Sequence, residues 1–374
     1  MSDFIPVNEP LLDGNEKKYL VECIDTGWIS SEGPFVSRFE TEFASRVGRK
    51  HGIAVTNGTA AIDVAVEALD IGPGDEVILP SFTIISCILQ IIRSGATPVL
   101  VDSDPLTWNM DTHLIEDKIT PLTKAIMVVH TYGLPVDMNP ILDICQKYDL
   151  KLIEDSAEMI GQTYRGIPCG SFGQISTVSF YPNKHITTGE GGMILTDDDD
   201  IANTCRELRN LCFQKGRRFV HERLGWNFRM TNLQAALGIA QLERLDEFIE
   251  KKRWIGQCYT ELLSTIPNLI LPHPRTQYSD NIYWVFGIVL DKNISFNADE
   301  AIRRLSELGV GCRPFFYPMH QQPILKKLGY FKSDHFPIAD LLYERGFYIP
   351  SGLSLNEEKL IRVSTAIKSI FSSC

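Results

Sequence analysis

Features that are missing from this sequence exclude several classes of protein. No run of about 18 or more apolar residues occurs, so no membrane-spanning helix is expected. The first residues carry no basic segment followed by an apolar stretch, so no secretory signal peptide is predicted. We therefore expect a cytoplasmic protein that does not associate with membranes.

Positive charge is scarce as well. The 36 lysine and arginine residues are outnumbered by 47 aspartate and glutamate residues, which gives a formal net charge of -11. Such a balance argues against nucleic acid as a partner. It does not exclude an anionic small molecule, because the N-terminus of a single helix can bind phosphate whatever the total charge.

Cysteine pairs with metal-ligand spacing are also missing. None of the nine cysteines forms a CxxC pair, so the sequence predicts no metal site. An odd number of cysteines suits a reducing compartment. The nine are Cys23, Cys87, Cys145, Cys169, Cys205, Cys212, Cys258, Cys312 and Cys374.

The chain does contain a long alternation of short apolar segments with amphipathic ones. This alternation indicates an α/β fold, in which a mostly parallel sheet carries helices on both faces. Ligands of such sheets bind beyond the carboxyl ends of the strands. The predicted strands are residues 52–55, 76–80, 98–102, 125–130, 151–155, 175–180 and 192–196, and the predicted helices are 35–47, 60–69, 84–94 and 142–148.

The pattern changes near residue 230. Apolar residues at helical spacing predict one long helix over 230–255, followed by a smaller α+β region. That region holds predicted strands at 284–290 and 310–313 and a predicted helix at 298–308. We expect two domains, an N-terminal arm with a large domain at 1–245 and a small domain at 246–374.

One lysine lies in a loop between two predicted strands. Lys184 follows the strand that ends at Phe180, and the glycine-rich segment TGEGG at 188–192 leads into the next strand. A lysine held in this way can bind pyridoxal phosphate as a Schiff base. The alternative is a surface lysine in a glycine-rich hairpin, which is the commoner case.

Two further segments follow predicted strands. Thr59, within NGTAA at 57–61, opens a helix after a strand, a geometry that binds phosphate through free N–H groups and a hydroxyl. Asn and Thr also cap helices without any ligand. Asp155 ends another strand, where a carboxylate can hold a pyridine nitrogen protonated or act as a helix cap. With Lys184, these residues share one predicted edge of the sheet.

Five motifs occur together in one order along the chain. They are NGTAA at 57–61, EDSAE at 154–158, SFYPNK at 179–184 with TGEGG at 188–192, GWNFRMTN at 225–232 and RPFFYPMH at 313–320. This combination resembles the DegT/DnrJ/EryC1/StrS family of sugar-nucleotide aminotransferases, which depend on pyridoxal phosphate. The resemblance covers nearly the whole chain. It implies the type I aminotransferase fold and a homodimer with both active sites at the subunit interface.

The resemblance also implies roles for individual residues. Lys184 would bind the cofactor and move protons, and Asp155 would pair with the ring nitrogen. Glu158 falls where the family often has Gln or His beside the ring. Gly58, Thr59, the Ala60 N–H and Ser179 would bind the phosphate. Asn227 would reach the phosphate of the partner subunit, or else simply start a helix.

Other positions match the family less firmly. The resemblance suggests substrate contacts for Trp28, His185, Arg229, Arg313, Tyr317 and His320. Arg229 and Arg313 would suit a diphosphate, because an arginine pair binds such a group well. Each of these substrate candidates has a structural alternative, and packing is favoured for His185. Trp28 either closes over a site or packs on the surface. Ile84 stands where the family often stacks an aromatic residue on the cofactor.

The resemblance implies transfer of the amino group of L-glutamate to carbon 4 of a nucleotide-linked 4-keto-6-deoxyhexose. The matches at 28–31, Glu158 and 186–192 favour the branch that uses GDP-4-keto-6-deoxy-D-mannose for surface polysaccharide such as O-antigen. A dTDP- or UDP-linked sugar is the near alternative. A 3-dehydratase branch replaces the lysine with histidine, so Lys184 argues against it. A regulator without turnover is disfavoured by Lys184, Asp155 and Ser179.

Overall fold

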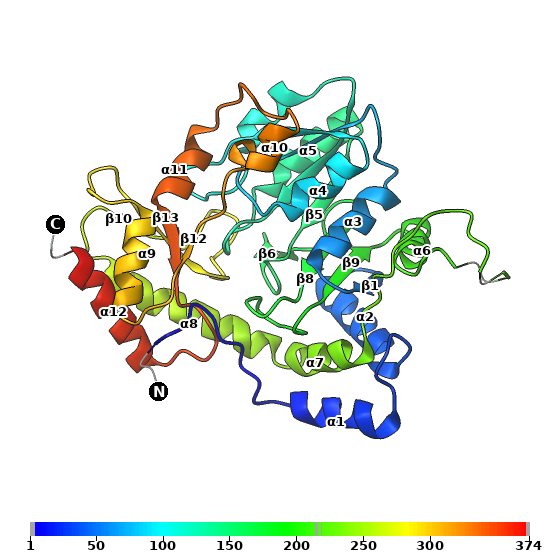
Figure 1. The fold of residues 1–374 in the computed structure, drawn as a ribbon, viewed down its shortest axis with the longest axis horizontal. Helices are drawn as coiled ribbons and strands as arrows, with labels where there is room; N and C mark the ends of the chain where they lie inside the picture. Colours follow the sequence, from blue (N-terminus) through cyan, green and yellow to red (C-terminus); the bar gives the residue numbers. More distant parts are fainter. Residues whose placement is uncertain (1–3, 214–215, 218, 372–374) are drawn as a thin grey trace.

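The computed structural model describes residues 4–213, 216–217 and 219–371. Within these residues the larger of two main β-sheets has seven strands in the order β1-β9-β8-β5-β4-β2-β3 (Figure 1). The strands are β1 (His51–Val55), β2 (Glu76–Pro80), β3 (Thr97–Val101), β4 (Thr123–Val129), β5 (Lys151–Asp155), β8 (Ile175–Ser179) and β9 (Gly192–Thr196).

Most strands of this sheet run parallel, as predicted. The pairs β2–β3, β2–β4, β4–β5 and β5–β8 are parallel, whereas β9 is antiparallel to both of its neighbours, β8 and β1. The connection from β8 to β9 contains no crossover helix, so the chain re-enters the sheet in the opposite direction. The loop that carries Lys184 is this connection.

Helices cover both faces of the large sheet. Successive residues of β1 point to opposite sides: Ile53 and Val55 join one core cluster and Ala54 joins the other. The first cluster includes α3 (Gly58–Ala68), α4 (Ser86–Arg93) and α6 (Asp199–Leu208). The second includes α2 (Pro34–Val47), α5 (Met138–Tyr148) and α7 (Asn232–Leu242). Burial on both faces explains why the strands are continuous apolar runs.

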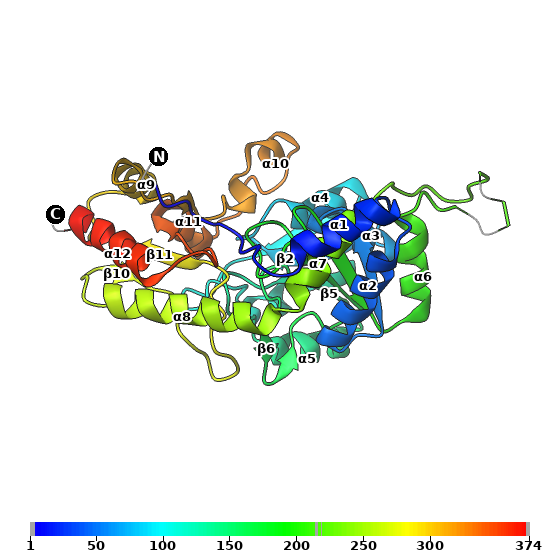
Figure 2. The ribbon, with the colours of Figure 1, turned by 90° about the horizontal axis from the view of Figure 1, so that it is seen from below.

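A smaller antiparallel sheet lies apart from the large one. Its order is β10-β11-β13-β12, and α8 (Leu245–Leu263) runs toward it from α7 (Figure 2). Its strands are β10 (Leu269–Ile270), β11 (Phe286–Leu290), β12 (Arg313–Pro314) and β13 (Gly346–Ile349). The helices in this part of the sequence are α9 (Ala298–Glu307), α10 (Pro323–Lys327), α11 (Pro337–Arg345) and α12 (Glu357–Phe371), of which α10 packs in the core cluster of the large sheet through Leu325. The remaining short elements are β6 (Thr163–Tyr164), β7 (Ile167–Pro168), η1 (Thr112–Leu114), η2 (Glu116–Lys118) and η3 (Met319–Gln321).

The prediction of one continuous helix over 230–255 is wrong. The chain turns at Glu243 and Arg244 between α7 and α8. Glu243 accepts hydrogen bonds from Asn15 and Tyr19, and Arg244 pairs with Asp13. The N-terminal segment with α1 (Glu16–Thr26) therefore contacts both residues of the break. The predicted strand over 310–313 is also much shorter, because only Arg313–Pro314 joins the sheet.

The N-terminal arm packs on the smaller sheet unit. Ile5 forms a bridge with Val310, and the Ser351 N–H donates to the Val7 carbonyl. The two-domain division at residue 245 falls at the start of α8 and stays a prediction.

The cysteines of the described chain are all free thiols, so no disulfide joins any two of them. Cys374 lies outside the described residues. Among the helices that the structure describes, none combines the length and the apolar character needed to cross a lipid bilayer.

Candidate active site

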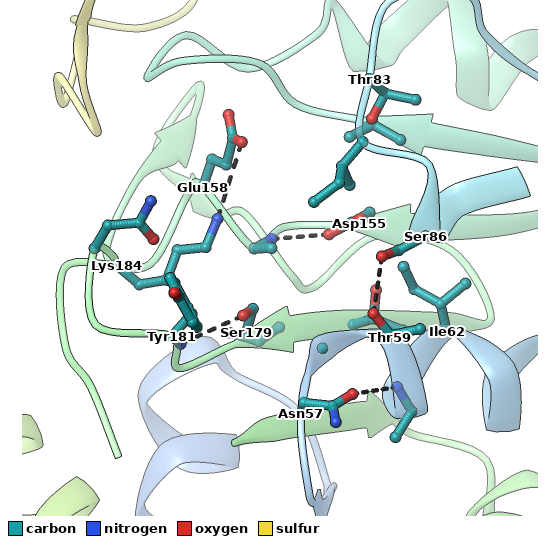
Figure 3. Close-up of a pocket in the computed structure, with 18 of the residues that line it drawn as sticks. Asn57, Thr59, Ile62, Thr83, Ser86, Asp155, Glu158, Ser179, Tyr181 and Lys184 are labelled. Atoms are coloured by element: carbon teal, nitrogen blue, oxygen red, sulfur yellow. Dashed lines mark hydrogen bonds and ion pairs between the residues drawn. The ribbon is translucent and has the colours of Figure 1, made fainter. Parts of the chain in front are cut away.

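A cavity of about 660 Å³ opens at the carboxyl ends of the parallel strands. Thr59, Asp155 and Lys184 all line it, so the structure brings together the three segments that the sequence placed at one edge of the sheet. Figure 3 shows Lys184 extending toward Glu158, with Thr59 and Ser179 at the other end of the group.

The loop after β8 holds Lys184 in place through its own backbone. The Lys184 N–H donates to the Tyr181 carbonyl at 2.9 Å, and the Thr188 N–H donates to the Phe180 carbonyl at 3.0 Å. Phe180 and Ile186 are buried beneath the loop. These contacts leave the lysine side chain pointing into the cavity, where only 10% of it is exposed.

Lys184 has an acidic and an aromatic neighbour. Its Nζ lies 3.9 Å from Glu158 Oε1 and 4.0 Å from the centre of the Trp284 ring. Burial lowers the pKa of Lys184 below 10.5, while the charges of Glu158 and Asp155 oppose that shift. Burial therefore favours the neutral amine, which is the nucleophilic form.

Glu158 is fixed by a backbone donor. Its Oε2 accepts a hydrogen bond from the Tyr132 N–H at 2.7 Å. Burial raises the pKa of Glu158 above 4.5, and the nearby Lys184 opposes this shift. In this pair burial disfavours the charged forms of both groups, whereas the attraction between the carboxylate and the ammonium favours them.

Asp155 is held by two donors at the end of β5. Its Oδ1 accepts from the Ala157 N–H at 3.0 Å, and its Oδ2 accepts from the Cys87 thiol at 3.4 Å. Burial raises the pKa of Asp155 above 3.8, and the Ala157 N–H and the Lys184 charge act in the opposite direction. The carboxylate is thus oriented before any ligand binds.

The neighbouring Glu154 belongs to a separate buried group with His130 and Cys169, whose ligand atoms lie close together. Glu154 accepts hydrogen bonds from His130 and from the backbone N–H groups of Gly170 and Phe172. His130 Nδ1 accepts from the Val136 N–H. Hydrogen bonds within the protein therefore already engage the carboxylate and the imidazole.

The start of α3 meets the end of β8 very closely. A Cβ atom at Gly58 would lie 2.7 Å from the Ser179 Cβ, so no larger residue fits there. The Thr59 hydroxyl bonds to Ser86 at 2.8 Å. The Ala60 N–H, predicted to bind phosphate, donates to Asn57 Oδ1 at 2.8 Å, so an anion would compete with this helix cap.

Of the weaker substrate candidates, only Arg313 lines this cavity. Arg229 bonds to Asn210 and lines a different cavity of about 350 Å³. Tyr317 packs its ring against Tyr343. Within one chain these two side chains therefore lie away from Lys184.

Trp28 and Asn227 are both exposed and do not line the cavity of their own chain. The two histidines are buried outside it. His185 is fully buried, and His320 Nε2 lies 2.9 Å from Asp340 Oδ1. Burial lowers the pKa of both histidines.

The sequence predictions did not identify several residues that surround Lys184. Aromatic side chains from distant segments complete the lining of the cavity. Ile84 also lines the cavity. Trp284 donates its indole N–H to the Asn183 carbonyl at 2.8 Å. The sequence signal that could have identified Trp284 is its position as an aromatic residue at the start of the predicted strand 284–290. The aromatic lining residues are Tyr181, Phe228, Trp284, Phe316 and Tyr348.

Comparison with known proteins identifies the family. The model of the DegT/DnrJ/EryC1/StrS aminotransferase family matches residues 10–368. The chain belongs to this family. It is 44% identical over 99% of its length to the whole of a Caulobacter vibrioides protein named GDP-perosamine synthase. It is 34% identical to EpsN of Bacillus subtilis, a putative pyridoxal phosphate-dependent aminotransferase, over 98% of this chain and 96% of EpsN.

Solved structures of aminotransferases have the same fold. The aminotransferase TlmJ from Streptoalloteichus hindustanus superposes with a TM-score of 0.91 at 29% identity, covering 99% of both chains. The type I aminotransferase fold predicted from the sequence is therefore confirmed. The chain is a pyridoxal phosphate-dependent aminotransferase.

The cavity fits this cofactor. A helix N-terminus with hydroxyl groups suits the phosphate, a buried carboxylate suits the pyridine nitrogen, and an amine suits the aldehyde. The close approach of Gly58 to Ser179 keeps side chains out of the space at the helix start. The volume also lies in the range of about 300–1,000 Å³ that is usual for small-molecule sites.

Proposed function

We propose that the chain transfers the amino group of L-glutamate to carbon 4 of GDP-4-keto-6-deoxy-D-mannose and so forms GDP-perosamine. The observation that carries this proposal is the 44% identity with the C. vibrioides GDP-perosamine synthase across the full length of both proteins. The cavity supports it with an amine, a carboxylate and a phosphate-binding helix start side by side.

Each cavity residue then has a role. Pyridoxal phosphate supplies an aldehyde that takes up the amino group and a ring that accepts electrons. The Lys184 amine would hold the aldehyde and, once free, would serve as the general base that moves a proton. Asp155 would keep the ring nitrogen protonated, and Glu158 would contact the cofactor from the cavity wall. Gly58, Thr59, Ala60 and Ser179 bind the phosphate, while Arg313 receives an anionic group of the substrate.

The uptake of pyridoxal phosphate by the apoprotein is expected to follow the neutral fraction of Lys184. Because burial lowers the pKa of this lysine, the uptake rate should rise with pH to a plateau with a midpoint below 10.5. Glu158→Gln removes a charge that raises the lysine pKa, so its midpoint should lie at still lower pH. Stopped-flow absorbance measures both rates, and Glu116→Gln on the surface serves as control. If the midpoint moves to higher pH in Glu158→Gln, the Glu158 charge does not raise the pKa of Lys184 and the prediction is wrong.

We also propose a homodimer whose active sites each receive Asn227 from the partner. Two observations support it. Asn227 is exposed and does not line its own cavity, and Leu224, three residues earlier, is 92% exposed. Phe219 and Val220 on the same segment are exposed as well, and several exposed apolar side chains close together are typical of a protein interface. Trp28 is half-exposed as well and suits the same interface.

Mixing two inactive variants tests this arrangement. Refolding Lys184→Ala together with Asn227→Ala should produce heterodimers in which one of two sites has both residues intact. We expect activity to return to about half that of the wild type per heterodimer, the fraction that one intact site of two gives. If Asn227 acts within its own chain, no site is complete and activity stays at the level of the separate variants.

The substrate proposal is tested with purified protein, pyridoxal phosphate and L-glutamate carrying an isotope-labelled amino group. GDP-, dTDP- and UDP-linked 4-keto-6-deoxy sugars are compared as acceptors by product mass spectrometry. We expect a labelled amino sugar from the GDP-linked acceptor. A labelled product from only a dTDP- or UDP-linked sugar would replace GDP in the proposal. An unlabelled deoxy-keto sugar would instead identify a dehydratase.

A further inference from the structure

Cys87 lies directly behind Asp155, on the first turn of α4. Its side chain is fully buried, and its sulfur lies 3.4 Å from Asp155 Oδ2. On its other side the sulfur lies 3.4 Å from the hydroxyl oxygen of Thr83. Thr83 is buried and lines the cavity, and Figure 3 shows it together with Asp155. The three groups therefore form a row that ends at the carboxylate.

The direction of these hydrogen bonds follows from burial. Burial and the nearby Asp155 charge raise the pKa of the Cys87 thiol well above 9, so the sulfur keeps its proton. A thiol has one proton to donate, and the carboxylate can only accept. The S–H therefore donates to Asp155, and the Thr83 hydroxyl donates to the sulfur.

This arrangement gives each oxygen of Asp155 its own donor. Oδ1 is served by the Ala157 N–H and Oδ2 by the Cys87 thiol. Both donors stabilise the ionised carboxylate against the penalty of burial. If the Asp155 carboxylate stays ionised, the proton stays on the ring nitrogen of the cofactor. Because both of its oxygens are held by donors, the carboxylate also cannot rotate away from that nitrogen.

We propose that Cys87 is a positioning residue for Asp155, and that Thr83 in turn orients its thiol. The inference rests on the proposed pairing of Asp155 with the cofactor nitrogen. It assigns to a buried cysteine a part in setting the charge and direction of that carboxylate. Cys87 itself does not line the cavity, so we do not expect it to touch the cofactor or the substrate.

Other charged and titratable groups also act on Asp155. Lys184 faces it from the loop after β8, and His130 lies at the end of β4. Glu158, three residues along the chain, interacts with both Asp155 and Cys87. All three stay unchanged in the variants used below, so a difference between variants reports the thiol contact.

The test compares four apoproteins: wild type, Cys87→Ala, Cys87→Ser and Thr83→Val. Aspartate labelled at its carboxyl carbon gives an NMR signal for Asp155, identified by its absence in Asp155→Asn. We expect the titration midpoint to move to higher pH in Cys87→Ala and to return toward wild type in Cys87→Ser, whose hydroxyl also donates. Thr83→Val should also move the titration midpoint of Asp155 to higher pH, but by a smaller amount.

Cofactor affinity gives a second measurement. Loss of one net hydrogen bond should raise the dissociation constant for pyridoxal phosphate about fivefold in Cys87→Ala and much less in Cys87→Ser. Cys205→Ala is the matched control, because Cys205 is equally buried but has arginines rather than a carboxylate nearby. It should change neither measurement.

Each outcome bears on the proposal. An unchanged midpoint in Cys87→Ala, or equal changes in the alanine and serine variants, would overturn it. If Cys87→Ala does not fold, the Thr83→Val titration decides, and no change there would overturn the orienting role and with it the proposal. A wild-type protein that fails to bind pyridoxal phosphate would refute the proposed function, whereas the apoprotein titration would still test the thiol contact.

Discussion

Lys184→Ala is expected to lower kcat by about 10⁴-fold or more, because the one lysine that lines the cavity among the described residues disappears. The residual rate would come from free amines and from binding alone. The visible absorbance of covalently bound cofactor should vanish in the same variant. Steady-state assays and an absorbance spectrum of the purified protein measure both effects.

Lys184→Arg separates the amine from its charge. A guanidinium stays protonated at every accessible pH, so it keeps the positive charge beside Glu158 without offering a nucleophile. We expect it to be as inactive as the alanine variant and to unfold at a temperature close to that of the wild-type apoprotein. Turnover near the wild-type rate in either variant would contradict the role of Lys184.

Asp155→Asn is expected to reduce kcat by about 10²- to 10³-fold. The amide cannot balance a charged ring nitrogen, and loss of one member of a buried charge pair costs about 3–5 kcal/mol. The effect should fall on kcat more than on the KM for the sugar, because the ring nitrogen does not contact the acceptor. Initial rates over a range of acceptor concentrations measure the two constants.

The stability of the apoprotein distinguishes this effect from misfolding. Burial raises the pKa of Asp155 in the folded chain, so the protonated carboxyl contributes stability that is present at low pH and is lost as pH rises through the folded pKa. The neutral asparagine avoids that loss. Asp155→Asn should therefore be at least as stable as wild type at neutral pH, measured by urea unfolding without cofactor. A variant that is both unstable and inactive would leave folding as the cause.

The sequence was sufficient to predict the bounds of those strands whose ends are marked by turn residues. The strands at Glu76–Pro80, Lys151–Asp155 and Gly192–Thr196 have the predicted bounds, since glycine, proline or polar residues flank each buried run. The break between α7 and α8 was missed because its contacts come from Asp13, Asn15 and Tyr19, more than two hundred residues away. Helical periodicity continues across the break and gives no sign of it.

The same limit applies to the site. Thr59, Asp155 and Lys184 could be chosen from the sequence because each lies at or just beyond the end of a strand, and Glu158 could be chosen from its place in a family motif. Cys87 could not be chosen, and Trp284 offered only the weak signal of an aromatic residue at the start of a predicted strand, because the contacts of both residues with Asp155 and Lys184 exist only in the folded chain. His320 was a candidate because of its place in a motif, whereas in the structure its side chain is buried beside Asp340 and lies outside the cavity.

The central claim is that one amine, Lys184, carries the cofactor. Reduction of the cofactor-loaded enzyme with borohydride, followed by proteolysis and mass spectrometry, would fix the cofactor to the residue that holds it. We expect a pyridoxyl group on Lys184. A pyridoxyl group on another lysine, such as the buried Lys252, or none on any peptide, would contradict it.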